Sequence, residues 1–236
     1  MTPGPPLDPE TVRAHVAEAR AAVAAAATAA GRDPAAVEIV AAVKYVTPDD
    51  LEAIAAAGIG RVGENRADAL IEKQAAYRDR FTWDFIGHLQ SRKVRDVVGR
   101  VALIHALSTA SAATSIERRA EAPQDVLVEV NVAGDPGKEG VAPAGLDAFL
   151  ELLAPLANVR VRGLMTMPPL AAEPDDSRPA FAALRELAAA ATARWAGAHA
   201  FEVLSMGTSQ DYPVAVAEGA TLVRLGTVLY GRRSSG

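Results

Sequence analysis

The chain has 236 residues, a formal net charge of -5 and no cysteine. This composition excludes disulfides, thiolate metal sites and a cysteine nucleophile, and the acidic balance argues against nucleic acid or an anionic membrane as the main partner. Half of the residues are hydrophobic, which suffices for one large core, and no uncharged stretch is long enough to span a bilayer. We therefore expect one domain over residues 1–236, soluble and cytoplasmic, with a small-molecule ligand.

The predicted elements alternate between helix and strand. The first is an alanine-rich amphipathic helix that starts at Pro9 behind an Asp8 cap and ends before Gly31. Strands are predicted at residues 37–43, 61–63, 83–87, 102–107, 126–132, 161–165, 201–205 and 222–226. Helices are predicted at residues 49–57, 66–80, 91–99, 109–122, 144–156, 178–195 and 212–218.

Eight successive strand–helix units predict an α/β fold, a single-domain (β/α)8 TIM barrel with a parallel sheet. The strand at 61–63 is short, so an open doubly wound sheet is the alternative, although no glycine-rich dinucleotide fingerprint supports it. In such a barrel the loops that follow the strands meet at one end, and this end carries the chemistry. Candidate site residues are therefore expected where the strands end.

A lysine ends the first predicted strand. Lys44 follows the apolar run 39–43 and is one of only four lysines among the 24 basic residues. A lysine in this position is commonly a solvated surface amine. Between Val43 and Tyr45, however, its amine would be partly desolvated, which favours the neutral, nucleophilic form that arginine cannot supply. We expect Lys44 to form a Schiff base with a carbonyl compound.

Two loops rich in small residues follow the seventh and eighth strands. They are LSMGTSQD at residues 204–211 and VRLGT at residues 223–227. Amides and hydroxyls in such loops bind phosphate, although ordinary turns and helix caps use the same residue types. The candidate phosphate ligands are Ser205, Gly207, Thr208, Ser209, Gly226 and Thr227. The ligand would be a phosphorylated carbonyl compound, such as pyridoxal 5'-phosphate or a sugar phosphate.

Seven motifs are spread along nearly the whole chain: AAVKYVTP, VGENRAD, WDFIGHLQSRK, VNVAGDPGKEG, GLMTM, LSMGTSQDYPVAVAEG and VRLGTVLYGRR. In this order they resemble the pyridoxal-phosphate homeostasis protein family, also called YggS or PROSC. The resemblance implies a single-domain barrel similar to the N-terminal domain of alanine racemase. It further implies that the chain holds pyridoxal 5'-phosphate (PLP) as an aldimine of Lys44, without established catalytic turnover.

The same resemblance assigns further residues. It places Arg224 beside the pyridine nitrogen, Asn65 at the border of the cofactor, and His88, Gln90 and Lys93 at the rim without a defined role. The implied cofactor-binding set is Lys44, Asn65, Ser205, Met206, Gly207, Ser209, Arg224, Gly226 and Thr227. The chain departs from the family pattern at Val43, Arg92 and Thr208, where the family usually has Ser, Asn and Met; these departures put individual contacts in question, and not the cofactor.

Arg224 bears on whether the protein is an enzyme. A permanently charged guanidinium beside the pyridine nitrogen discourages protonation there and weakens the cofactor as an electron sink, although an ion pair at the barrel floor is the ordinary role for such a residue. The sequence shows no second domain of the kind from which alanine racemase takes its second base. We therefore expect a monomeric, non-enzymatic carrier with PLP-dependent apo-enzymes as partners. A racemase-like enzyme acting on amino acids and a cofactor-free lysine aldolase are the alternatives.

The remaining polar residues suggest structural roles. His15, His105 and His199 are scattered without the spacing of metal ligands, so no metal site is expected. Glu129 and Asn131 alternate along the fifth strand and are predicted to face the barrel interior in a hydrogen-bonding network. Asp211 and Tyr212 are predicted to cap the helix that follows.

Overall fold

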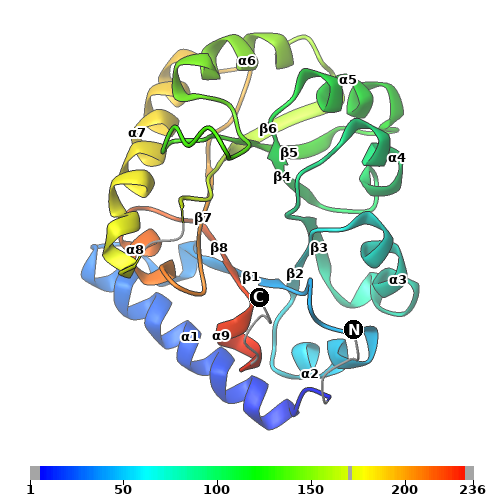
Figure 1. Ribbon diagram of the computed structural model, residues 1–236, viewed down its shortest axis with the longest axis vertical. Coiled ribbons are helices and arrows are strands. Elements are labelled where there is room, and N and C mark those ends of the chain that lie inside the picture. Colours follow the sequence, from blue (N-terminus) through cyan, green and yellow to red (C-terminus); the bar gives the residue numbers. More distant parts are fainter. Residues whose placement is uncertain (1–5, 170–171, 232–236) are drawn as a thin grey trace.

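Eight parallel strands form a closed barrel. The computed structural model describes residues 6–169 and 172–231. The strands are β1 (Glu38–Ala42), β2 (Arg61–Glu64), β3 (Thr82–Phe85), β4 (Leu103–Leu107), β5 (Gln124–Glu129), β6 (Val159–Met165), β7 (Val203–Thr208) and β8 (Leu222–Leu225). Each strand pairs with the next in the chain, and β8 pairs with β1 to close the ring (Figure 1). The predicted closed barrel, including its short second strand, is confirmed, and the doubly wound alternative is wrong.

Helices surround the strands on the outside of the barrel (Figure 1). They are α1 (Pro9–Ala29), α2 (Leu51–Ala56), α3 (Ala67–Tyr77), α4 (Val94–Val97), α5 (Ala110–Arg119), α6 (Leu146–Leu153), α7 (Arg178–Arg194), α8 (Tyr212–Ala217) and α9 (Thr227–Tyr230). The first helix starts as predicted, because the Asp8 side chain accepts a hydrogen bond from the Thr11 amide at 2.9 Å and Pro9 occupies the first turn. Helix α1 packs across α8, α9 and α2, so it covers the outside of the barrel where the first strand pairs with the last.

Several element boundaries differ from the prediction. The predicted helix 91–99 is a 3-10 turn at Ser91–Lys93 followed by the single turn of α4, in which only Val94 and Val97 are buried. The seventh strand starts later and runs through Gly207, since its backbone pairing continues past the glycine at which the pattern indicated a loop. These shifts lengthen β7 toward the carboxyl end of the barrel.

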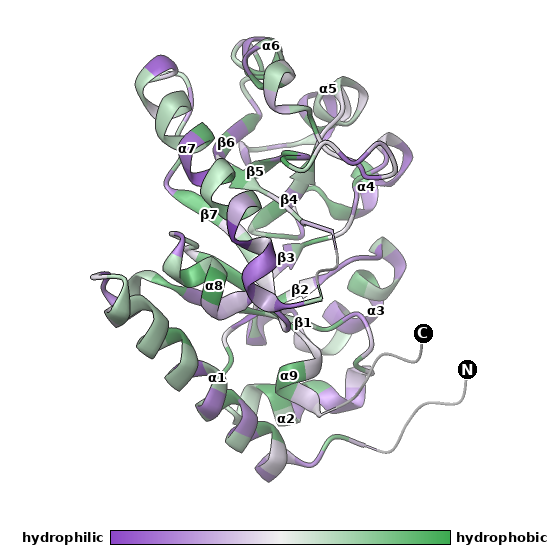
Figure 2. Cartoon of the chain, turned by 60° about the vertical axis from the view of Figure 1, so that its left-hand side comes forward, coloured by the Kyte–Doolittle hydropathy of each residue, from purple (hydrophilic) through white to green (hydrophobic). Residues whose placement is uncertain are grey.

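The core has two layers. Most buried apolar residues lie between the strands and the helices, and a smaller cluster fills the inside of the barrel. The inner cluster consists of Val40, Leu103, Ala106, Leu127, Met165 and Leu222. Figure 2 shows the matching amphipathic pattern, with hydrophobic and hydrophilic turns interleaved along α1. The barrel is therefore packed and is not a pore, and ligands are restricted to its ends.

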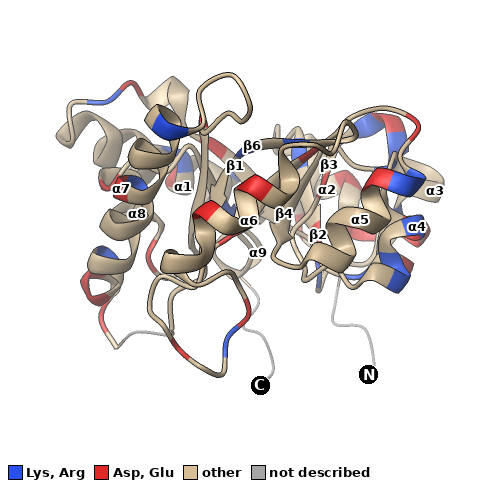
Figure 3. Cartoon of the chain, turned by 90° about the horizontal axis from the view of Figure 1, so that it is seen from above, with Lys and Arg blue, Asp and Glu red and all other residues tan. Residues whose placement is uncertain are grey.

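Charged residues of both signs are interspersed on the outer helices, as on α4 and α5 (Figure 3). Within residues 6–169 and 172–231, no helix combines the length and apolarity needed to cross a bilayer.

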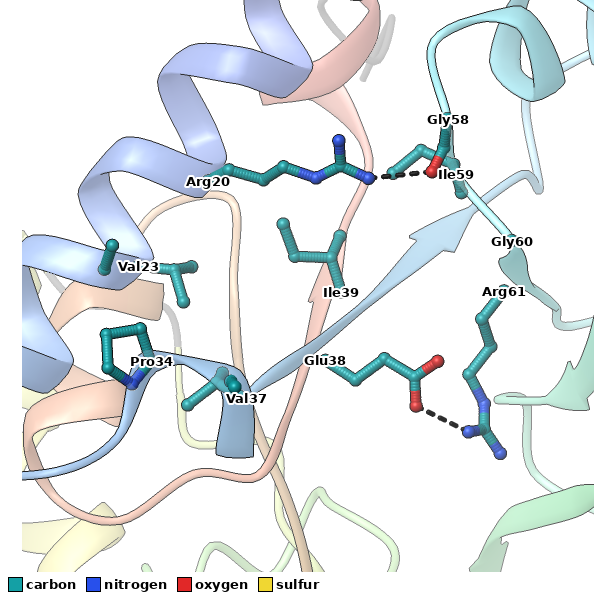
Figure 4. Close-up of a pocket in the computed structure, with 12 residues that line it drawn as sticks. Arg20, Val23, Pro34, Val37, Glu38, Ile39, Gly58, Ile59, Gly60 and Arg61 are labelled. Carbon is teal, nitrogen blue, oxygen red and sulfur yellow. Dashed lines mark hydrogen bonds and ion pairs between the residues drawn. The ribbon is translucent and has the colours of Figure 1, made fainter.

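A pocket of ≈ 460 Å³ lies at the amino-terminal end of the strands, between α1, the start of β1 and the start of β2 (Figure 4). Its charged groups are already engaged: Arg20 donates to the Gly58 carbonyl at 2.7 Å, and Arg61 pairs with Glu38 at 2.7 Å. The pocket contains none of the predicted site residues, which lie at the opposite end of the barrel. We assign no function to it.

Candidate functional site at the barrel mouth

Lys44 lies two residues beyond β1, in a turn that a 3.0 Å hydrogen bond from the Val46 amide to the Val43 carbonyl closes. Its side chain is exposed, with Nζ 5.0 Å from the ring centroid of Tyr45, itself 55% exposed. The predicted partial desolvation of the amine is wrong in this arrangement, because Tyr45 faces solvent instead of covering the lysine. The amine is accessible to a ligand at the mouth.

A buried ion pair stabilises the turn that carries Lys44. Lys73 on α3 pairs with Glu64 at the end of β2, and Lys73 Nζ also donates to the Val43 carbonyl at 2.7 Å. Glu64 Oε1 accepts from the amides of Asn65 and Arg66 at 2.7 and 3.2 Å. Both charged side chains are buried, so the pair joins the segment before Lys44 to the segment that carries Asn65. The side chain of Asn65 is exposed at the same rim.

The two loops with small residues lie against each other. Ser209 Oγ accepts from the amides of Gly226 and Val228 at 3.1 and 3.4 Å. A Cβ atom at Gly226 would stand 3.5 Å from the Ala42 carbonyl oxygen, so this loop also borders the end of β1. Thr227 is exposed at the start of α9. The structure thus brings Lys44, Ser209, Gly226 and Thr227 to one end of the barrel, where backbone amides already converge on an oxygen atom.

The end of β7 and the loop that follows it have a tightly constrained backbone. Gly207 has φ +89°, and a Cβ atom there would stand 2.5 Å from Ala215 Cβ on α8. Asp211 Oδ1 accepts from the Thr208 amide at 2.7 Å, so Asp211 closes the loop instead of capping α8 with its side chain as predicted. The side chain of Met206 is buried in the outer core, so only its backbone is available at the mouth.

Replacing Gly207 by alanine is expected to lower the free energy of unfolding by about 1–3 kcal/mol, because the methyl group strains the backbone and pushes α8 away. Gly197→Ala is the matched control: Gly197 has φ +88°, but nothing lies within 4 Å of the added atom. Urea denaturation of both variants separates the two effects. Equal destabilisation would show that contact with α8 does not constrain the loop.

Arg224 is held inside the barrel by uncharged partners. Its Nη1 donates to Ser205 Oγ, and its Nη2 donates to the Thr166 carbonyl at 3.0 Å. Burial lowers the pKa of Arg224 to about 10, which leaves the guanidinium charged at neutral pH. Ser205 is fully buried and also bonds His105, so its hydroxyl supports Arg224; the predicted role of Ser205 as a phosphate ligand conflicts with these bonds.

The hydrogen bonds continue from Arg224 through the barrel. His105 Nδ1 lies 2.9 Å from Ser205 Oγ, and its Nε2 lies 3.0 Å from Asp84 Oδ2. The same Asp84 oxygen accepts from Arg61 Nε at 2.8 Å. Burial lowers the pKa of His105, which favours the neutral ring. A neutral ring that donates from Nε2 to Asp84 accepts the Ser205 proton at Nδ1, and this orients the Ser205 oxygen toward Arg224.

Known proteins are similar to this chain over most of its length. The sequence profile of the alanine racemase N-terminal domain matches residues 15–234. A protein of Aquifex aeolicus is 42% identical over 208 residues, which cover 86% of this chain and 90% of the relative. A protein of Pseudomonas aeruginosa is 37% identical over 230 residues, 96% of this chain and 97% of the relative. Both are named pyridoxal phosphate homeostasis protein. The chain belongs to the pyridoxal phosphate homeostasis protein family.

Solved structures that are similar to this chain have the same fold. PipY of Synechococcus elongatus without PLP is 34% identical and superposes with a TM-score of 0.82, over 93% of this chain and 100% of the other. PipY with PLP bound is 32% identical, with a TM-score of 0.80. Alanine racemase of Corynebacterium glutamicum is 15% identical with a TM-score of 0.68, and it shares the fold over 62% of its own length.

In this family member, sequence reasoning missed Lys73, Asp84 and the supporting role of His105. Lys73 lies three residues after the buried Leu70, so helical periodicity alone places it on the inner face of α3. Asp84 and His105 lie at the inner positions of otherwise apolar strands, which also marks them. His105 is structural, as predicted for the scattered histidines. Its partners could not be named, because Ser205 is 100 residues away in the chain.

The pH dependence of stability is expected to report His105. Its folded pKa is lowered from 6.5, so the unfolded chain takes up a proton at a higher pH than the folded chain. The stabilising effect of the neutral ring is complete above about pH 6.5 and declines below it, with a slope of at most about 1.4 kcal/mol per pH unit. Urea denaturation of the wild type and of His105→Gln between pH 7.5 and 5.5 measures this. The variant should lose stability less steeply, and parallel curves would contradict the assignment.

Proposed function

We propose that this protein binds PLP reversibly at the barrel mouth and serves PLP homeostasis without catalytic turnover. The observation that carries the proposal is the meeting of three segments: the exposed Lys44 amine, the Ser209 loop and the Gly226 loop. The PLP-bound structure of the 32% identical PipY supports it. We further propose that the protein acts as a cytoplasmic monomer and that PLP-dependent apo-enzymes exchange cofactor with it.

The residues present fit the two reactive ends of this cofactor. PLP supplies an aldehyde, which condenses with a primary amine with loss of water, and Lys44 offers such an amine on the solvent side of its turn. The amides of Gly226 and Val228 donate to the Ser209 hydroxyl oxygen and can donate to a phosphate oxygen instead. In this arrangement Thr227 adds an exposed hydroxyl, and Met206 and Gly207 contribute backbone.

Arg224 favours binding without turnover. Ser205 and Thr166 fix its guanidinium, and its partly lowered pKa still leaves it charged at neutral pH. We propose that it lies beside the pyridine nitrogen. A fixed cation there cannot accept the proton that would make the ring a strong electron sink, so carbanion chemistry on amino acids is poorly supported.

The test uses the full chain loaded with PLP and reduced with borohydride. Because trypsin does not cleave after a modified lysine, the expected product is a peptide spanning residues 33–61 that carries the cofactor on Lys44. Attachment elsewhere, or none, overturns the binding proposal. The loaded protein is then incubated with amino acids in deuterated water. Exchange of the α-hydrogen at an enzymatic rate would instead support the racemase-like alternative.

A further inference from the structure

A second set of polar groups meets at the mouth, outside the predicted PLP contacts. His88 lies three residues beyond β3, Glu129 ends β5, and Glu139 lies in the loop after β5. One ligand atom from each of the three side chains lies within 4.8 Å of the other two. His88 Nδ1 contacts Glu139 Oε2 directly, and these side chains are 31% and 57% exposed. One imidazole and two carboxylates therefore face a common point from three different segments.

Glu129 is the unusual member of this cluster. Its carboxylate is half-buried, and in the described part of the chain it forms neither a hydrogen bond nor an ion pair, in contrast to the prediction that it joins a hydrogen-bonding network. Burial raises the pKa of Glu129, and the nearby Glu139 adds to this effect. Two carboxylates so close together are mutually destabilising, and a cation between them would relieve both the repulsion and the burial cost.

The loop that carries Glu139 is held in place. Asn131 Nδ2 donates to the carbonyls of Asp135 and Lys138 at 2.8 and 3.3 Å; it is hydrogen-bonded as predicted, but it lies two residues beyond β5 and bonds its own loop. The amide of Val141 donates to the Glu129 carbonyl at 2.8 Å, which joins the two ends of the loop. The backbone segments that carry Glu129 and Glu139 are thus fixed relative to each other, and this lowers the cost of bringing the two side chains to one ion.

The neighbouring cations are directed elsewhere. Lys138 Nζ donates to the Met167 carbonyl at 3.2 Å, and Arg224 donates to Ser205 and Thr166. Both lie close enough to lower the pKa of Glu129 electrostatically, so they weaken cation binding without occupying the cluster. A bound metal ion would replace the direct contact between His88 Nδ1 and Glu139 Oε2.

We propose that His88, Glu129 and Glu139 bind one divalent transition-metal ion. A mixed set of one imidazole nitrogen and two carboxylate oxygens suits Zn²⁺, Co²⁺, Mn²⁺ or Fe²⁺, whereas Mg²⁺ and Ca²⁺ favour oxygen ligands alone. Three protein ligands leave at least one coordination position for water or another small ligand. This site is separate from the proposed attachment of PLP to Lys44 and does not depend on it.

The test is a Co²⁺ titration of the full, metal-free chain without added PLP, read by visible absorption and by metal analysis after equilibrium dialysis. We expect about one ion per chain and a ligand-field spectrum that includes nitrogen coordination. His88→Ala and Glu139→Gln should weaken binding by at least about tenfold. Both positions are partly exposed, so the variants should fold, which circular dichroism checks. Glu151→Gln, an exposed change on α6, is the matched control and should bind as the wild type does.

Equal binding by the wild type and His88→Ala would overturn the proposal, and so would an absence of binding by the wild type; either result leaves His88 and Glu139 as an ion pair only. Because no PLP is present, neither result bears on covalent attachment to Lys44. Failure of the metal site and failure of the proposed function are therefore distinguishable.

Discussion

Lys44→Ala is expected to lose covalent attachment of PLP completely. The Lys44 amine is the group that the structure places exposed at the end of β1, beside the Gly226 loop, and alanine offers no nitrogen for condensation. The amides proposed to bind phosphate are untouched, so the variant should still bind PLP noncovalently and more weakly. After borohydride reduction, intact-mass measurement should show about one cofactor per chain for the wild type and none for the variant.

Lys93→Ala is the control for this experiment. Lys93 is an exposed lysine in the turn before α4, and its removal should leave the reduced adduct intact. If Lys44→Ala still fixes the cofactor through another amine, then Lys44 is not the attachment point. Lys44→Ala removes an exposed side chain whose contact is with the Tyr45 ring. The melting temperatures of Lys44→Ala and Lys93→Ala should therefore match within a few degrees.

Lys73→Ala is expected to lower the free energy of unfolding by about 3–5 kcal/mol, because it leaves the buried Glu64 carboxylate without its cation. It also removes the 2.7 Å bond from Lys73 to the Val43 carbonyl, so the turn before Lys44 loses its support. Urea denaturation measures the first effect. Weaker attachment of PLP at a temperature where the variant is folded measures the second.

Two further variants sharpen this prediction. Asp68→Ala breaks the exposed Arg66–Asp68 pair in the same part of the chain and should destabilise the protein far less than Lys73→Ala does. The double variant Lys73→Met, Glu64→Leu removes both buried charges and should be more stable than Lys73→Ala, although the amides of Asn65 and Arg66 lose their acceptor. A double variant less stable than Lys73→Ala would show that hydrogen bonding to Glu64, and not its charge, dominates.

The sequence predicted the barrel well because its strands are short apolar runs between clear helix signals. Val40 could be placed in a buried strand and Gly226 in a loop from local pattern alone, whereas the pattern wrongly placed Gly207 in a loop and extended the first strand to Val43. The order of the elements then assembled Lys44 and the two loops at one end. Helix 91–99 failed because a polar segment with helical composition had too few buried residues to form more than one turn.

The local sequence pattern could not predict which side chains pair with one another. Ser205 was assigned to phosphate from its loop, yet Arg224 and His105 engage its hydroxyl beneath the mouth. The exposure of Lys44 depends on how Tyr45 turns, which the apolar run before it does not determine. His88 and Glu139 meet across two loops about 50 residues apart, so no metal-ligand spacing in the sequence indicates their contact.

The pairing of β8 with β1 has a consequence for folding. Lys44 follows the first strand and Gly226 follows the last, so in the proposed binding mode the two ends of the ligand contact parts of the chain that become neighbours only when β8 pairs with β1. A half-barrel that ended after β4 would contain Lys44 and would lack the loops proposed to bind phosphate. If PLP binds in this way, the absorbance of bound PLP should return during refolding only when β8 pairs with β1. Bound PLP would then stabilise the junction between the first and last strands of the barrel.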